Sequence, residues 1–205
     1  MNIKTIYLFL ILVIFFKAPT LFGQSIATTE WQKVIPSPNL PSEINCKRSN
    51  NNLDIAFFKN KYYLAFRTAP THFASKKTII YIVSSIDLKN WTFEKEIKLG
   101  TDAREPRFCV YKDTLRFLFF ESGSSLTKFE PHNIWNAETV GDGKWSALVD
   151  VNLPGFVPWR MRINNDTLLL SAYYGIDLYK SGHKGNLRLF KSTDAKNWTP
   201  ISEKP

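Results

Sequence analysis

The chain has 205 residues, of which 44% are hydrophobic and 22% are charged, so it carries enough apolar side chains to build a packed core. Its 27 Lys and Arg residues outnumber its 18 Asp and Glu residues, which gives a formal net charge of +9. The basic residues are scattered in runs of no more than two, and this pattern argues against a nucleic-acid-binding surface, which would need clustered Lys and Arg.

The first residues have the pattern of a secretory signal peptide. Lys4 precedes an unbroken apolar run at residues 6–16, which is followed by Lys17 and a short exit segment at residues 20–24. The run is well below the ~20 residues that span a bilayer. We therefore expect residues 1–23 to be removed, which leaves a secreted or periplasmic protein with no membrane attachment. An uncleaved anchor is the alternative.

Tryptophan recurs at nearly equal intervals along the chain. Trp31, Trp91, Trp145 and Trp198 are separated by 60, 54 and 53 residues. A period of this length indicates one supersecondary unit that is copied and stacked, because a single unit cannot bury its apolar face alone. The period therefore predicts a repeat architecture.

Each predicted unit begins with a hairpin. Polar turns at residues 59–60, 112–113 and 164–165 stand 31, 32 and 33 residues ahead of the next tryptophan. Runs rich in aromatic and β-branched residues flank every turn, as is typical of strands. These runs are residues 55–58 and 62–66, 108–111 and 115–120, and 161–163 and 168–174.

Two further strands follow in each unit. The third strand is clearest at residues 78–84 and 186–192, and Trp91 opens a fourth at residues 91–97. Four antiparallel strands make one blade of a β-propeller. The sequence therefore predicts an all-β chain with about three complete blades, at residues 43–99, 100–152 and 153–205.

Three blades are too few to close a ring, since propellers typically have four to eight. We expect the segment at residues 24–42, around Trp31, to supply a lone ring-closing outer strand. The chain is then a partial copy of a longer propeller. An open array that pairs with another chain and a swapped fourth strand are the alternatives. An open last blade leaves an unpaired strand edge, which predicts self-association.

The motif S-x-D-x-K-N-W occurs twice, at residues 85–91 and 192–198. Its Asp is expected to accept hydrogen bonds from backbone amides two or three residues on, and so to fix a tight turn. The motif resembles the S-x-D-L-x-x-W turn of the five-bladed propeller glycoside hydrolases, including families 43 and 32, and more loosely the Asp box of sialidases. The resemblance covers residues 43–205 and implies a propeller that acts on or binds carbohydrate.

Residues 102–107 read D-A-R-E-P-R, and four of the six are charged. They lead into the first strand of the second blade, and the first strands of a propeller line a central channel of the concave kind that ligands favour. The segment is similar to the R-D-P element of families 32 and 43, with Glu105 in place of its Asp. In those families this carboxylate steadies the transition state or tunes the acid. The resemblance implies a pair of carboxylates, one protonated and one ionised.

The chain departs from that family pattern in its third unit. Alignment of the units on their turns places Glu105 opposite Asn52 and Val157, so Glu105 has no carboxylate counterpart. Residues 159–162 read W-R-M-R where the family pattern has the glutamate that serves as the acid. Ordinary acid–base hydrolysis is therefore not assured by the sequence.

The same alignment places Arg107 opposite Asp54 and Trp159. Asp54, on the first blade, is the candidate base or nucleophile, with Asp102 and Glu105 as its partner carboxylates. The alternatives are a structural Asp bonded to nearby amides, for Asp54, and an ion pair with a neighbouring arginine, for Glu105. If the chain is an enzyme, these three residues predict a glycosidase.

Arginines gather near the ends of the predicted inner strands, and guanidinium groups bind carboxylates in bidentate fashion. They suggest an anionic sugar such as a sialic or uronic acid, as in sialidases, although the sialidase F-R-I-P element is absent. The expected substrate-binding residues are Arg67, Arg104, Arg107, Trp159, Arg160 and Arg162. The rival functions are a non-catalytic carbohydrate-binding or scaffolding propeller and a truncated, inactive remnant.

The sequence predicts neither a metal site nor a cofactor. Its three histidines lie in predicted loops without a pairing pattern, and Cys46 and Cys109 are its only cysteines. Because export permits disulfides, these two are either bonded across neighbouring blades or are two buried free thiols.

Overall fold

The computed structural model describes residues 30–141, 144–176, 178, 180–182 and 185–201. The chain divides into two units, residues 1–32 and 33–205, and of the first unit only residues 30–32 are described. The expected signal peptide lies outside the described residues, among which no helix is long and apolar enough to cross a membrane. The described part of the second unit holds thirteen strands in three antiparallel sheets and no helix, which confirms the all-β prediction.

The first sheet is a four-stranded antiparallel meander. Its strands, in spatial order, are β1 (Ser49–Phe58), β2 (Lys61–Ala69), β3 (Ile79–Ser85) and β4 (Thr92–Ile97). Lys59 and Asn60, between β1 and β2, have φ angles of 45° and 61°. Two residues in this left-handed conformation make the hairpin turn whose twist matches that of the flanking strands.

The second and third sheets repeat this plan. The second contains β5 (Asp102–Tyr111), β6 (Thr114–Ser122), β7 (Pro131–Val140) and β8 (Lys144–Trp145), and β9 (Val149–Asp150) also pairs with β7. The third contains β10 (Phe156–Asn164), β11 (Thr167–Tyr174), β12 (Asn186–Ser192) and β13 (Thr199–Pro200).

The third hairpin turns one residue later than the sequence predicted. Asn164 pairs with Thr167, so the turn is at residues 165–166, where Asn165 has a φ of 52°. Asparagine tolerates this conformation better than most residues. Because residues 164 and 165 are both Asn, local sequence could not separate the two registers.

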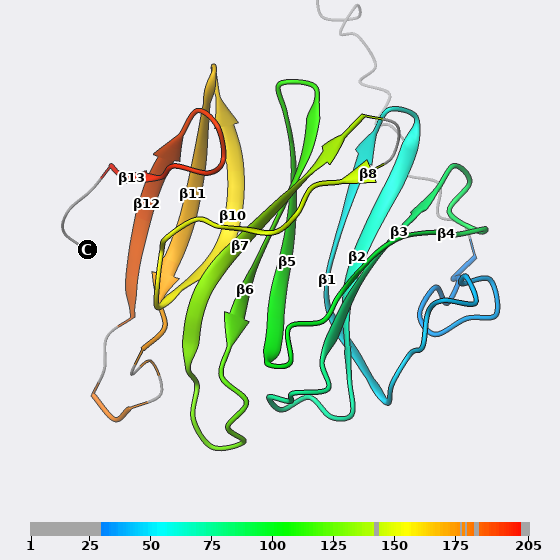
Figure 1. The fold of residues 1–205 in the computed structure, drawn as a ribbon, viewed down its shortest axis with the longest axis horizontal. Coiled ribbons are helices and arrows are strands. Elements are labelled where there is room, and N and C mark those ends of the chain that lie inside the picture. The colour runs from blue at the N-terminus through cyan, green and yellow to red at the C-terminus, as the bar shows by residue number, and fades with distance from the viewer. Residues whose placement is uncertain (1–29, 142–143, 177, 179, 183–184, 202–205) are drawn as a thin grey trace, which may run out of the picture. The chain divides into compact units, whose positions relative to one another are not determined.

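The sheets stack side by side as three blades of an incomplete ring. The inner strand β5 contacts both β1 and β10 and lies between them (Figure 1). Phe117 and Phe119 of β6 pack in a core with the first sheet, whereas Leu118 and Phe120 pack in a core with the third. Side chains of a strand point alternately to its two faces, and β6 is apolar on both because a blade lies on each side.

The segment before β1 covers a face of the first sheet. Residues 30–48 form no strand, Trp31 is fully exposed, and residues 24–29 lie outside the described residues. The ring-closing strand expected around Trp31 therefore has no counterpart in the described residues. The segment instead packs apolar side chains onto the first sheet, namely Val34, Ile35, Leu40, Ile44 and Cys46. Lys47 N donates to Thr68 Oγ1 at 2.7 Å. Burial of these side chains against the sheet needs no strand pairing, which explains the difference.

Both copies of the S-x-D-x-K-N-W motif form the predicted turn. Asp87 Oδ1 accepts hydrogen bonds from the backbone N of Asn90 and of Lys89, each at 2.8 Å. These bonds, that from Asn90 above all, hold the pKa of Asp87 well below its usual range. Burial alone would raise the pKa of Asp194 in the second copy, but its hydrogen bonds from Asn197, Lys196 and Ser192 together outweigh burial and lower the pKa.

Cys46 and Cys109 are free thiols. Cys46 packs against the core of the first blade, whereas Cys109 packs between the second and third blades. Burial raises the pKa of both thiols. Of the two alternatives, the structure has the unbonded pair.

Candidate functional site

The first strand of each blade, β1, β5 and β10, is its inner strand, and each of the three carries a β-bulge. The register of pairing shifts at Asn52 in β1, between Arg104 and Arg107 in β5, and at Trp159 in β10. Bulges re-aim side chains and occur often near active sites. The residues of the candidate site lie at or beside these three bulges.

The observed hairpins correct the alignment of the third unit. Arg107 lies four residues before the end of β5, as Asp54 does in β1 and Arg160 in β10. Arg160, not Trp159, is therefore the counterpart of Arg107. By the same count, the counterpart of Glu105 is Pro158 and not Val157. The third blade still offers no carboxylate at either position.

Glu105 and Asn52, equivalent residues of neighbouring inner strands, bond to each other. Asn52 Nδ2 donates to Glu105 Oε1 at 2.5 Å, and Arg107 Nη2 lies 2.6 Å from Glu105 Oε2. Both residues have a positive φ, 44° for Asn52 and 52° for Glu105. A positive φ is uncommon for a residue other than glycine, and such backbone strain clusters at functional sites.

Asp102 lies at the centre of a buried ion-pair network. Its Oδ1 accepts from Arg67 Nε at 3.1 Å, from Arg67 Nη2 at 2.8 Å and from Thr78 Oγ1 at 2.5 Å, while Arg104 Nε donates to its Oδ2. Arg67 Nη1 also donates to Asn51 Oδ1 at 3.2 Å. Burial lowers the pKa of the Arg67 guanidinium, and Asp102 acts against that shift.

This network differs from the roles expected of Asp102 and Arg67. Both side chains are 0% exposed, so neither can contact a ligand bound at the surface of this structure. The catalytic role expected of Asp102 and the substrate contact expected of Arg67 stay predictions, which the burial of both side chains does not support. Together the two residues hold Arg104, whose side chain is partly exposed and whose Nη2 donates to His72 O at 2.8 Å.

Asp54 joins the first two inner strands. Its Oδ2 accepts a hydrogen bond from the backbone N of Phe108 at 2.7 Å, and its side chain is partly buried. This bond is the structural contact that the sequence left as the alternative for Asp54. A catalytic role for this carboxylate remains a proposal.

Trp159 provides an exposed aromatic ring at the junction of β5 and β10. It is 53% exposed, and Arg107 Nε donates to its carbonyl oxygen at 2.7 Å. The Arg107 guanidinium also lies 5.9 Å from the centre of its ring, and the Tyr173 ring lies 5.9 Å away at a steep angle. We call Asn52, Glu105, Arg107 and Trp159 the inner-strand cluster.

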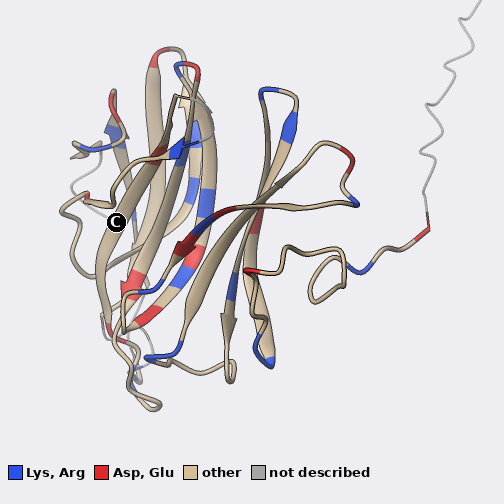
Figure 2. Cartoon of the chain, turned by 45° about the vertical axis from the view of Figure 1, so that its right-hand side comes forward, with Lys and Arg blue, Asp and Glu red and all other residues tan. Residues whose placement is uncertain are grey.

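The two arginines of β10, Arg160 and Arg162, are exposed. Arg160 accepts a hydrogen bond at its carbonyl oxygen from Ser171 Oγ at 3.3 Å, and Arg162 Nη1 reaches its neighbour's carbonyl at 3.5 Å. Basic and acidic residues are interspersed along the ribbon (Figure 2). Within the described ranges, no group of three or more His, Cys, Asp or Glu residues could hold a metal ion.

Two contributors to the site were not identified from the sequence. Asn51 and Thr78 bond to the buried ion pair from β1 and from the residue before β3. The run of three asparagines at residues 50–52 was a usable signal, because asparagine is a poor strand former. Thr78 carried no local signal of its contact with Asp102, which is 24 residues away.

The fold is that of solved propeller glycoside hydrolases. The chain is similar to an α-L-arabinofuranosidase from Lactobacillus brevis, with a TM-score of 0.54 and 13% identity over 76% of this chain and 55% of that one. It is similar to a family 117 glycoside hydrolase from Zobellia galactanivorans, with a TM-score of 0.53 and 11% identity over 74% and 55% of the two chains. An α-L-arabinanase from Penicillium chrysogenum complexed with arabinobiose gives a TM-score of 0.53 and 18% identity, over 75% and 48%.

These comparisons show the fold and leave the activity open. The chain spans about half the length of the solved structures that it matches. Its sequence matches no protein-family profile and no curated protein. The predicted resemblance to five-bladed propeller glycoside hydrolases is confirmed at the level of architecture.

Proposed function

We propose that this propeller unit binds carbohydrate at the inner-strand cluster. The observation that carries the proposal is the half-exposed indole of Trp159, flanked by Arg107 and by the ring of Tyr173. The apolar face of a sugar ring packs well on an aromatic ring, while charged planar groups beside it bond to hydroxyls. The carbohydrate-active enzymes that share the fold support the same substrate class.

Binding is a better fit to the geometry than hydrolysis. A general acid must reach the glycosidic oxygen, and Asp102 is fully buried. Glu105 has both carboxylate oxygens engaged, by Asn52 and Arg107, and Asp54 is bonded to the Phe108 amide. Each candidate carboxylate therefore already has a structural contact that holds it in place.

Isothermal titration against a panel of arabinan, xylan and uronic-acid oligosaccharides tests the proposal. Trp159→Ala should lower the affinity for the best ligand at least about tenfold, as removal of an aromatic anchor does. Trp31→Ala is the matched control, because Trp31 is exposed and lies outside the three sheets. Equal affinities of the Trp159→Ala variant and the wild type would reject this site.

Hydrolysis is the second candidate, and the strained backbone of Glu105 is the observation that favours it. In this case Asp54 acts as base or nucleophile and Glu105 as its partner. The test measures reducing ends released from arabinan oligosaccharides by the wild type and by Glu105→Gln and Asp54→Asn variants, with Glu96→Gln as an exposed control. Turnover that survives in the variant that carries both Glu105→Gln and Asp54→Asn would exclude this pair.

We also propose that the chain is exported, on the basis of the pattern in residues 4–24. Amino-terminal sequencing of the mature protein should begin at Gln24. The third sheet leaves several apolar side chains exposed, including Ile163 and Leu187, so we retain the proposal of self-association. Its readout is a mass by light scattering that rises with protein concentration.

A further inference from the structure

We propose that the saccharide site extends across the blades, from Trp159 to a second aromatic surface formed by His72 and Phe73, so that its ligand is an oligosaccharide rather than a single sugar. We call these two residues the loop platform. They lie in the loop at residues 70–78, which joins β2 to β3, and Phe73 is 60% exposed. The choice of a saccharide rests on the proposed function at Trp159, and the loop platform adds a minimum length to that ligand.

Two arginines fix the backbone of the loop platform. Arg67, whose side chain is 0% exposed, donates from Nη2 to Phe73 O at 3.0 Å. Arg104 donates from Nη2 to His72 O at 2.8 Å. The network that surrounds Asp102 therefore also holds the backbone of the platform in place. An aromatic side chain on a fixed backbone loses less conformational freedom on binding than one on a free loop.

The first inner strand orients the His72 ring. Asn51 Nδ2 lies 3.2 Å from His72 Nδ1. Because Asn51 Oδ1 accepts a hydrogen bond from Arg67 Nη1 at 3.2 Å, the amide nitrogen faces the imidazole, and Nδ1 acts as the acceptor. Neutral imidazole then carries its proton on Nε2, a donor suited to a sugar hydroxyl. The Phe73 ring lies 6.2 Å from the His72 ring at a steep angle and supplies an apolar face.

Polar side chains line the way from the loop platform to Trp159. Asn51 is followed in β1 by Asn52, whose Nδ2 donates to Glu105 Oε1 at 2.5 Å. Arg107 Nη2 donates to Glu105 Oε2 at 2.6 Å, and Arg107 Nε donates to Trp159 O at 2.7 Å. These contacts cross β1, β5 and β10 in turn. Polar groups between two aromatic surfaces match a chain of sugar rings, which are apolar on their faces and carry hydroxyls at their edges.

The two aromatic surfaces lie at the same end of the sheets but in different blades. Ser49 pairs with Ala69, so the loop after β2 lies beside the start of β1. The strands β5 and β10 start at the same end (Figure 1), and Trp159 is the fourth residue of β10. The second blade separates the two surfaces, and packed sheets lie about 10 Å apart. A single sugar ring is therefore too short to contact both.

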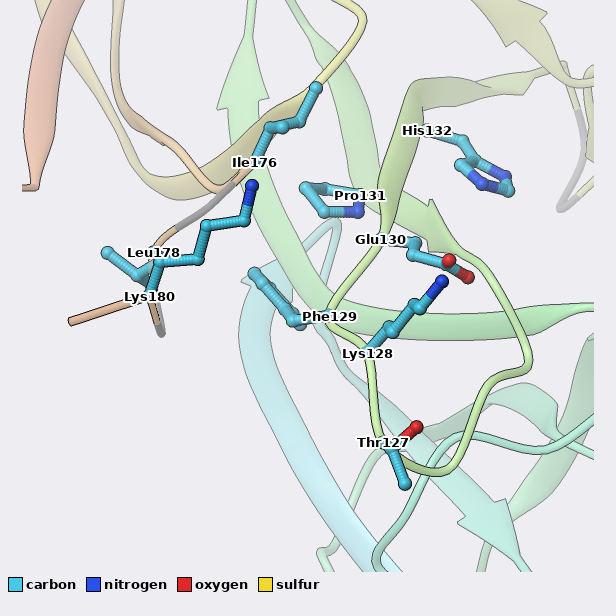
Figure 3. A pocket seen from close by; sticks show the side chains of 9 residues that line it. All are labelled: Thr127, Lys128, Phe129, Glu130, Pro131, His132, Ile176, Leu178 and Lys180. Atoms are coloured by element: carbon cyan, nitrogen blue, oxygen red, sulfur yellow. The ribbon is translucent and has the colours of Figure 1, made fainter. Parts of the chain in front are cut away.

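A pocket of about 530 Å³ offers the oligosaccharide a different direction. It lies between the second and third blades, where the β6–β7 loop and the residues after β11, Leu178 among them, form its walls (Figure 3). We favour the loop platform, because hydrogen-bonded polar groups lead to it from Trp159 across the inner strands. A substitution of Leu178 tests the other direction.

Isothermal titration with the disaccharides and hexasaccharides of arabinan, xylan and galacturonan tests the extent of the site. Phe73→Ala should lower the affinity for the best hexasaccharide at least about fivefold, as loss of an aromatic contact does. It should leave the affinity for the matching disaccharide unchanged. Phe73→Tyr keeps the ring and should bind both lengths as the wild type does. Phe57→Ala is the matched control, because Phe57 is 55% exposed and lies at the opposite end of β1.

Other results overturn the loop platform. If Phe73→Ala binds the hexasaccharide as tightly as the wild type does, Phe73 makes no contact with the ligand. An equal loss for both lengths is not the effect of a second surface. The same loss in Phe57→Ala or in Phe73→Tyr is not due to the ring of Phe73. A loss in Leu178→Ala with none in Phe73→Ala places the further sugars in the pocket.

Trp159→Ala separates the loop platform from the proposed function, since it should lower the affinity for both lengths. Hexasaccharide binding that needs Trp159 but not Phe73 rejects the loop platform and keeps the proposed function. Binding of neither length by the wild type rejects both.

Discussion

Replacement of Arg67 by Met should destabilise the fold severely, because it strips a buried carboxylate of its main partner. Arg67 and Asp102 are both 0% exposed, and Arg67 supplies two of the hydrogen bonds to Asp102 Oδ1. Methionine replaces the aliphatic stem of arginine and removes the guanidinium group. The variant therefore removes the charge together with its hydrogen bonds.

The expected loss follows from what remains around Asp102. Removal of one partner of a buried ion pair costs about 3–5 kcal/mol, since it leaves an uncompensated charge. Thr78 Oγ1 still donates to Oδ1 and Arg104 to Oδ2. We therefore expect the lower end of the range, a fall of about 3 kcal/mol in the free energy of unfolding.

Urea unfolding followed by tryptophan fluorescence measures this change. Lys59→Met is the control: its ion pair with Asp113 has side chains that are 60% and 80% exposed, so its loss should cost less than about 1 kcal/mol. The double variant Arg67→Met, Asp102→Leu should recover much of the loss, because it removes the buried carboxylate, and Arg104, which loses that partner, is partly exposed and still donates to His72 O. A fall for Arg67→Met no larger than that for the control would refute the reasoning, as would a double variant less stable than the single.

The remaining predictions concern the turns and the amino-terminal segment. The pKa of Asp194 is lowered in the folded state, so the stability that its hydrogen bonds add is present above the usual Asp pKa of about 4 and is lost progressively as the pH falls below it. In Asp194→Asn, the difference between the urea midpoints of unfolding at about pH 7 and about pH 3 should be smaller than in the wild type. An equal difference would contradict this. Leu88 is partly exposed with a φ of 61°, so Leu88→Gly should raise the free energy of unfolding by about 1 kcal/mol, and a fall would show that its packing matters more. Ile44→Asp should lower the urea midpoint because Ile44 packs on the first sheet, whereas the exposed neighbour Glu43→Ala should not; equal midpoints would mean that the segment contributes no stability.

The strands of the three blades were predictable because their signals are local. The turn at residues 59–60 and the aromatic runs beside it determine β1 and β2 without reference to the rest of the chain. The S-x-D-x-K-N-W turns were predictable for the same reason, since Asp87 bonds to amides within three residues of itself. The third hairpin was misplaced by one residue where two asparagines stand together.

The candidate site was predictable only in composition. The charged segment at residues 102–107 stands out in the sequence, and Glu105, Arg107 and Trp159 lie together in the structure. Whether each side chain is exposed was not predictable. Asp102 and Glu105 are three residues apart in sequence, yet one is fully buried and the other lies at a bulge with part of its side chain exposed.

By itself, the sequence determined the all-β class and the repeat of four-stranded units, because strand patterns act over a few residues and the tryptophan spacing shows that these patterns recur along the chain. The tertiary structure decided which charged residues face a ligand and how the amino-terminal segment packs. Asp102 is buried because Arg67 and Thr78 reach it from the first blade, and the segment containing Ile44 covers a sheet face in place of the expected strand. Contacts between blades join residues that are tens of positions apart, so no local pattern encodes them.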